Sequence, residues 1–416
     1  MFKAAVKKDT FLDKYLAYMS PLETPLAYDF WCGIWLLSSL VGRRTCVARP
    51  VAPVFLNVYA VLCADAGTTR KSSAIRMCET VYRAAGLDKQ HALISGKTTP
   101  EGIVKELSVR SNDGRGATAS ILVSELVTFL GKEQYAMGMP GLLTDLYDCP
   151  LHREGFRVGT DARTIKNVYV NFLTASTPSW LVRAINPDVI EGGFTSRCLF
   201  IIEEKRKQMV AWPTVTDPTD RLDNCVQSLH SISRKIQRYH DRGINLTDIA
   251  KTDFIKWYEN RDYNATDPFT ASFEAREDHH VLRLAGLLAI NDQSFVIDAF
   301  HVRHAIRIIA SHKLSAATLF GSGRADRRIV NGIDKLRDVL ANAGALGLSQ
   351  TELLFKLRNY MRPREIEYAL IIMHELEMVA KFEVKTGGRP KTVWRGSNKL
   401  LSRHLNETLM TRLKED

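Results

Sequence analysis

The sequence lacks the usual marks of secreted, membrane-spanning and metal-binding chains. Its seven cysteines are scattered through 416 residues without a C-x-x-C pair, which argues against a disulfide framework and a cysteine zinc site. The longest apolar run, Trp31 to Val41, is too short to cross a bilayer. The opening MFKAAVKKDTF has no apolar signal-peptide core, and internal repeats and low-complexity tracts are missing. We therefore expect a soluble protein of the cytoplasm.

Acidic residues are in the minority, and the chain is too long for one typical domain. It carries 57 lysines and arginines against 46 aspartates and glutamates, a formal net charge of +11. An anionic partner is expected, with nucleic acid first. Changes in the pattern of apolar residues along the chain predict five parts. They are an N-terminal helical segment at 1–50, an α/β core at 51–205, a helical lid domain at 206–320, a compact C-terminal domain at 321–400 and a basic, polar tail at 401–416.

A near-match to a phosphate-binding loop lies in CADAGTTRKSSAI, residues 63–75. The standard loop reads G-x-x-x-x-G-K-[ST], and here Asp65 and Arg70 occupy the two glycine positions. Lys71 can still serve as the cation for the β- and γ-phosphates, and the Ser72 hydroxyl as a ligand of Mg²⁺. The other nucleotide contacts predicted here are Ala66, Gly67, Thr68, Thr69, Arg70 and Ser73. The alternative is a basic loop that merely precedes a helix.

The sequence on either side of this loop has the pattern of an α/β fold. The β-branched run VFLNVYAVLC ends at the loop, and apolar residues after it recur at helical spacing. Further apolar strands in HALIS, ILVSE, VYVNFLTAST and CLFIIEE alternate with helical stretches. Such alternation predicts a mostly parallel sheet covered by helices on both faces, as in a P-loop NTPase core of the RecA or AAA+ kind. From about residue 205 the pattern becomes helical.

Further positions could act on a bound nucleotide. Glu125 ends the strand ILVSE, where an acidic residue positions Mg²⁺ or the attacking water, although Ser124 stands where an aspartate is usual. Ser176 and Thr177 end the next strand and could contact the γ-phosphate. Arg197 in GGFTSRCLF could reach the nucleotide of a neighbouring subunit. The alternatives are a solvent-facing glutamate, ordinary strand-end hydroxyls and a surface arginine.

Residues 329–395 have the pattern of a winged helix-turn-helix. Three helical stretches, the second opened by a capping box of Ser349 and Glu352, precede strand, Gly-Gly turn and strand in KFEVKTGGRPKTVWRG. The basic side chains of this hairpin that we expect to contact DNA phosphates are Lys385, Arg389 and Lys391. A winged helix used only for protein contacts is the alternative.

The order of these segments resembles a known family. The chain resembles the P-loop ATPases of phages and mobile elements that are grouped as domain of unknown function three-nine-eight-seven. The segments that carry this resemblance are FLNVYAVLCADAGTTRKSS, ILVSELVTFLG, NFLTASTPSWL, GGFTSRCLF and TGGRPKTVW. This resemblance implies an ATPase associated with a replication helicase or primase, in a bacterial or phage-infected cytoplasm. A looser similarity to minichromosome-maintenance-type AAA+ helicases matches their Ser-Arg finger to Ser196-Arg197. It also matches their lid arginine to Arg283 in VLRLAG, which implies that Arg283 contacts the nucleotide.

The leading interpretation is an ATP-hydrolysing motor on DNA, with Mg²⁺ as cofactor and a homo-oligomeric ring, for example a hexamer. The catalytic residues we expect are Lys71, Glu125 and Arg197, with Ser72 and Glu125 as magnesium ligands. A hairpin in FRVGTDARTIKN would bind single-stranded or forked DNA through Arg157, Arg163 and Lys166. The alternatives are a DNA-binding initiator or helicase loader that uses ATP as an assembly switch, and a small-molecule kinase.

Overall fold

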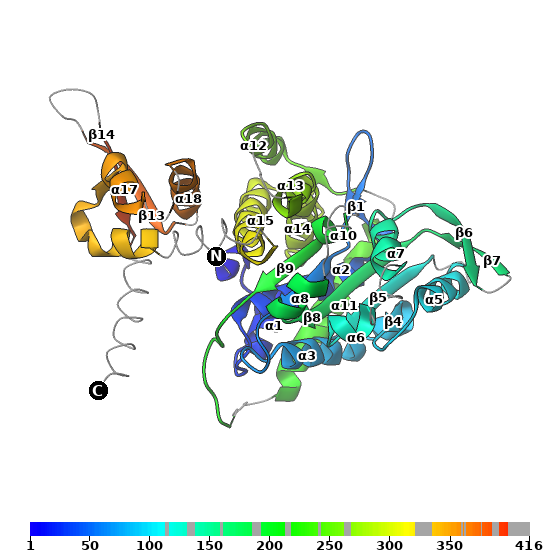
Figure 1. Ribbon diagram of the computed structural model, residues 1–416. Helices are drawn as coiled ribbons and strands as arrows, with labels where there is room; N and C mark the ends of the chain where they lie inside the picture. The colour runs from blue at the N-terminus through cyan, green and yellow to red at the C-terminus, as the bar shows by residue number, and fades with distance from the viewer. Residues whose placement is uncertain are drawn as a thin grey trace. The chain divides into compact units, whose positions relative to one another are not determined.

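Five parallel strands form the largest sheet of the protein, in the order β4-β5-β8-β3-β9 (Figure 1). In the computed structural model they span Ala92–Ile94, Thr118–Val123, Tyr169–Ser176, Tyr59–Cys63 and Cys198–Ile202. Cys63 of β3 lies beside Ser176 of β8 and Ile202 of β9, and Val123 of β5 lies beside Thr174. These four strands therefore end at one edge, the carboxyl edge of the sheet. The mixed α/β class and the parallel sheet predicted from the sequence are confirmed.

The structure describes residues 1–112, 116–130, 138–158, 161–184, 193–212, 218–239, 243–261, 268–320, 335–358, 361, 363–375, 377–384 and 391–397. The chain divides into a first unit, Met1–Leu319, and a second unit, Phe320–Asp416. None of the helices in the described ranges combines the length and apolar character that crossing a membrane requires.

Helices cover both faces of the sheet. The main hydrophobic core contains α1 (Phe11–Met19), α2 (Leu26–Val41), α3 (Lys71–Ala84), α11 (Pro218–Tyr239), α14 (Glu277–Asn291) and α15 (Ala299–Phe320). Ala60 and Leu62 of β3 face this core. On the opposite face Tyr59 meets Tyr147 of α7 (Gly138–Tyr147), with ring centroids 4.8 Å apart. This alternation of side chains along β3 is what a strand buried on both faces requires.

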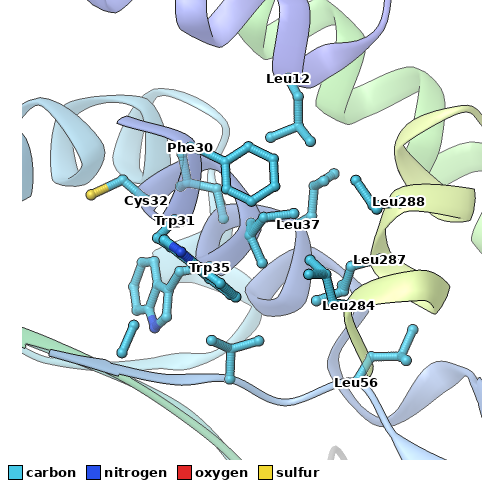
Figure 2. Close-up of a cluster of buried hydrophobic side chains, with 14 of the residues drawn as sticks. Leu12, Phe30, Trp31, Cys32, Trp35, Leu37, Leu56, Leu284, Leu287 and Leu288 are labelled. Atoms are coloured by element: carbon cyan, nitrogen blue, oxygen red, sulfur yellow. The ribbon is translucent and has the colours of Figure 1, made fainter. Parts of the chain in front are cut away.

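Helix α2 is buried nearly all the way around. Its Phe30, Trp31 and Trp35 lie among leucines of α1 and α14 (Figure 2). Both tryptophans are at most 2% exposed. The same core continues through the helices that follow residue 205. The predicted boundaries at 50 and 205 therefore do not divide this core, which contains side chains from before, between and after them.

Other elements extend the first unit. The run VFLNVYAVLC is divided, because Val54–Phe55 form β2, which pairs antiparallel with β1 (Cys46–Val47) before β3 begins. The predicted hairpin between β5 and β8 is present, as β6 (His152–Val158) and β7 (Asp161–Lys166). Further described elements are η1 (Phe2–Ala5), η2 (Gly42–Arg44), α4 (Leu87–Gln90), α5 (Pro100–Asn112), α6 (Leu126–Leu130), α8 (Pro178–Ala184), α10 (Phe194–Arg197), α12 (Asp248–Glu259), α13 (Pro268–Glu274), β10 (Asn245–Leu246) and β11 (Val296–Ile297).

The second unit contains a three-stranded antiparallel sheet in the order β12-β14-β13. Its described elements are a helix over 335–342, η3 (Gly344–Leu346), β12 (Leu348–Ser349), α17 (Gln350–Leu357), α18 (Pro363–Glu375), β13 (Val379–Val384) and β14 (Lys391–Gly396). The predicted capping box of Ser349 and Glu352 is confirmed at the start of α17. Gly347 has a φ of +66°, and a Cβ added there would lie 2.6 Å from the carbonyl oxygen of Trp394.

Candidate active site

The loop over residues 64–70 joins β3 to α3 at the carboxyl edge of the sheet. Arg70 precedes α3 with φ 57° and ψ 37°, in the left-handed region. It stands at the second glycine position of the standard pattern, and Gly67 also has a positive φ, 75°. The left-handed region costs a residue with a Cβ roughly 1–2 kcal/mol. The backbone at Arg70 therefore has a conformation that glycine favours, although the residue is arginine.

The Lys71 ammonium is held inside this loop. Its Nζ donates to the carbonyl of Ala64 at 2.6 Å and to that of Asp65 at 3.0 Å. Burial lowers the pKa of Lys71, and the negative charges of nearby groups, Asp65 and Glu125 among them, oppose that shift. Lys71 and Glu125 are thus close enough for their charges to interact across the edge of the sheet.

Three more of the predicted residues gather at the same edge. Glu125 is exposed and directly precedes α6. Ser176 ends β8, the strand between β3 and β5, and its carbonyl accepts from the Ala64 N–H at 3.4 Å. The Thr177 carbonyl begins α8 by accepting from the Leu181 N–H at 3.0 Å. The structure therefore brings Glu125, Ser176 and Thr177 to the side of the sheet where the loop lies.

The side chains of the loop differ in where they point. Those exposed to solvent are Ala66, Thr68, Arg70 and Ser72, while Ser73 is half-buried. Thr69 is fully buried, and its hydroxyl donates to Tyr28 Oη at 3.3 Å. Tyr28 of α2 in turn donates to the Cys63 carbonyl at 2.6 Å. The Thr69 side chain is thus part of the core, and the expected contact of Thr69 with a phosphate would have to be made by its backbone N–H.

Two residues that the sequence did not single out also contact the loop. Arg206 donates from Nε to the Thr68 carbonyl at 2.9 Å and from Nη2 to the Gly67 carbonyl at 3.1 Å. The Glu23 carboxylate accepts from Arg70 Nε at 2.7 Å and from Arg206 Nη1 at 3.0 Å. The hydrogen bond from Arg70, one from the Val210 N–H at 3.1 Å and the contact with Arg206 lower the pKa of Glu23 to about 2. No local pattern marks either residue, because only the fold brings them together.

Arg197 lies at the other edge of the sheet. It precedes β9, whose first residue, Cys198, lies beside Tyr59, the first residue of β3. A five-residue strand separates this edge from the loop by roughly 16 Å. The Arg197 side chain is 10% exposed, and its Nη2 forms an ion pair with Asp148 at 2.8 Å. Arg197 therefore does not reach the loop of its own chain.

Arg283 is a buried structural residue at that same edge. It is 5% exposed, donates from Nε to the Phe55 carbonyl at 2.9 Å, and donates from Nη1 to Tyr147 Oη at 2.9 Å. Its guanidinium also lies over the Tyr147 ring, 4.2 Å from the centroid. The expectation that Arg283 contacts a nucleotide at the loop of its own chain is therefore corrected: it joins α14 to β2 and α7.

The described residues among the predicted DNA contacts lie on two hairpins. Arg157 and Arg163 are on β6 and β7, and Lys166 ends β7 with an exposed side chain. Lys391 begins β14 and is exposed. The other two residues predicted to contact DNA, Lys385 and Arg389, lie outside the described residues.

Metal ligands and related proteins give no further indication of chemistry. Within the described ranges, no three or more histidine, cysteine, aspartate or glutamate side chains are grouped so as to hold a metal ion. No protein-family model matches the sequence, and no curated protein is significantly similar to it.

Proposed function

We propose that the first unit binds and hydrolyses ATP at the loop of residues 64–72. The observation that carries this proposal is the meeting of the Lys71 ammonium, the N-terminus of α3 and the exposed Glu125 at the carboxyl edge of a parallel sheet. Ligands of open parallel sheets bind at this edge, and a helix N-terminus attracts phosphate. Lys71 would bind the phosphates, and Glu125 would accept a proton from the attacking water.

Mg²⁺ is the cofactor that this chemistry implies, and the donors at the site fit it. The Ser72 hydroxyl and the Glu125 carboxylate are hard oxygen ligands on exposed side chains. Mg²⁺ is commonly held by one or two protein oxygens together with phosphates and water, so a cluster of several carboxylates is not needed. When bound with ATP, the ion offsets phosphate charge.

We further propose that hydrolysis serves work on DNA, in a replicative helicase-like ATPase of a phage or mobile element. The net charge of +11 supports this proposal, as do the exposed Lys381 and Lys391 on the two strands of the second unit's hairpin. The helices and antiparallel strands of that unit are compatible with a winged helix-turn-helix. A ring of identical subunits would let each chain act on DNA in turn.

One observation favours the alternative, an initiator or helicase loader in which ATP binding drives assembly. Arg197 is buried and ion-paired with Asp148, which also binds Arg276 at 3.1 Å. In this arrangement the Arg197 guanidinium is committed within its own chain rather than presented to the nucleotide of a neighbour. A switch that binds ATP and hydrolyses it slowly would need no such contact.

ATP binding and hydrolysis, measured with and without single-stranded DNA, test the proposal. Lys71→Ala should weaken ATP binding about ten- to hundredfold, because a charged hydrogen-bond partner of the phosphates is lost. Lys89→Ala, an exposed lysine on α4, is the matched control and should bind normally. Normal ATP binding by folded Lys71→Ala protein would refute the site.

Glu125→Gln separates binding from chemistry. It should keep ATP bound and lower the rate of hydrolysis by about 10²–10⁴, the usual contribution of a general base. Loss of ATP binding instead would show that Glu125 has another role. ATP-driven strand unwinding distinguishes the motor from the assembly switch, which would bind DNA and ATP without unwinding.

A further inference from the structure

Arg206 contacts the phosphate-loop backbone at two successive peptide groups. Its Nε and Nη2 donate to the carbonyls of Thr68 and Gly67, at 2.9 and 3.1 Å. Its third nitrogen, Nη1, donates to Glu23 at 3.0 Å, so the guanidinium is fixed from both sides. This planar fork matches two neighbouring acceptors in a way that a lysine ammonium does not.

These contacts determine where the N–H groups of the loop point. In a trans peptide the C=O and the following N–H lie on opposite sides. Because the Gly67 and Thr68 carbonyls face Arg206, the N–H groups of Thr68 and Thr69 face away from it. The Thr68 N–H accordingly points at the Asp65 carbonyl, at 3.4 Å, and Lys71 Nζ donates to the same oxygen at 3.0 Å. The Thr68 N–H and the Lys71 ammonium therefore converge on one side of the loop.

We propose that Arg206 is a positioning residue that turns the loop N–H groups toward the phosphates, in a loop that lacks both standard glycines. Arg206 binds the outer carbonyls, Glu23 holds Arg206 in place, and the Thr68 and Thr69 N–H groups become donors beside Lys71. The hydrogen bond from the Thr68 N–H to the Asp65 carbonyl, at 3.4 Å, is longer than the usual range, and the Thr68 hydroxyl donates to the same carbonyl at 2.9 Å. A phosphate oxygen can therefore replace the carbonyl as partner of the N–H without leaving that carbonyl unpaired. This role rests on the proposed function, that the loop binds a nucleoside triphosphate.

Binding of inorganic tripolyphosphate and of ATP, measured by calorimetry, tests this role. The conservative variant Arg206→Lys keeps the positive charge but cannot donate to both carbonyls and to Glu23 in the same plane. It should weaken binding of both ligands at least about tenfold, equivalent to about 1.4 kcal/mol. The salt dependence of binding should stay unchanged, because the number of positive charges is the same. Lys205→Ala, an exposed neighbour, is the control and should bind as the wild type does.

The outcomes separate this role from its alternatives. Wild-type affinity in Arg206→Lys would overturn the proposal, because charge alone would then be enough. A loss of binding in Arg206→Ala that added methylguanidinium restores would support it, since a merely structural defect would not be repaired at the loop. Weak binding in Arg206→Lys accompanied by a lowered thermal midpoint and no such rescue would overturn it in favour of a general structural role. Tripolyphosphate binding that Lys71→Ala leaves intact would instead refute the phosphate site itself.

Discussion

Replacing Lys207 with methionine should destabilise the first unit by leaving a carboxylate buried without its counter-charge. Lys207 Nζ lies 2.8 Å from Asp29 Oδ2 and also donates to the Met19 carbonyl at 2.8 Å. Asp29 is 1% exposed, and its Oδ1 accepts from the Thr24 hydroxyl at 2.6 Å. Methionine fills most of the space of lysine without its charge.

The expected magnitude follows from the burial of the pair. Removing one partner of a buried ion pair costs about 3–5 kcal/mol. The Lys207 side chain is 21% exposed, so solvent screens the pair in part and the lower end, about 3 kcal/mol, applies. For a unit of this size such a loss should lower the thermal midpoint by roughly 5 °C or more.

The loss should also depend on pH in a defined direction. Burial raises the pKa of Asp29 to about 6, and Lys207 opposes that shift. A carboxyl whose pKa is higher in the folded state stabilises the fold fully below its unfolded pKa of about 3.9, and this contribution is lost as the pH rises through 6. Without Lys207 the pKa of Asp29 should rise further. The difference between wild type and variant should therefore be largest near pH 8 and smaller near pH 5.5.

The assay is thermal or urea unfolding at both pH values, for the wild type, Lys207→Met, Asp29→Asn and the double variant. The double variant should be more stable than Lys207→Met, because it no longer buries an unpaired charge. Two results would refute this reasoning: a Lys207→Met loss that is equal at both pH values, or a double variant as unstable as Lys207→Met.

Three further predictions concern the loop, the neighbouring subunit and the second unit. Gly347→Ala should lower the unfolding temperature of the second unit while ATP binding persists, since its φ is +66° and the added Cβ would meet the carbonyl oxygen of Trp394; calorimetry that shows no change would contradict this. Trp212 is 86% exposed and lies six residues after Arg206, which contacts the loop. The fluorescence of Trp212 should therefore change when ATP is added, and Trp212→Phe should abolish the change. A wild-type signal that ATP leaves unaltered would count against a nucleotide at the loop. If Arg197 acts on a neighbour's nucleotide, mixing Arg197→Ala with Lys71→Ala protein should restore part of the ATPase activity, whereas mixed assemblies without recovery favour the switch.

Much of the α/β core could be predicted because its signals are local. Apolar, β-branched runs mark β5, β8 and β9, and the run that ends in Cys63 leads directly to the loop. Lys71 begins a helix whose apolar spacing is visible in the sequence, and the capping box of Ser349 and Glu352 needs only two residues three positions apart. Such features depend on neighbouring residues in the chain, so the sequence carries them in full.

Contacts between distant parts of the chain could not be predicted in the same way. Arg283 lies on α14, and the packing of α14 against β2 sets its position. No spacing along the chain reveals the contacts of Arg283 with Phe55 and Tyr147. Glu23 and Arg206 are 183 residues apart. Ion pairs over such separations follow from the tertiary fold, which local periodicity does not encode.

The place of β3 within the sheet has a consequence for the order in which the protein can be made. Both of its neighbours, β8 and β9, come more than a hundred residues later in the chain. At a synthesis rate of about 5–20 residues per second, this apolar strand waits several seconds on the ribosome before either neighbour exists. Arg206 emerges later still, after β9. A nascent chain that stops before residue 198 should therefore bind phosphate more weakly than the full chain, leave one edge of β3 unpaired, and depend on chaperones to stay out of aggregates.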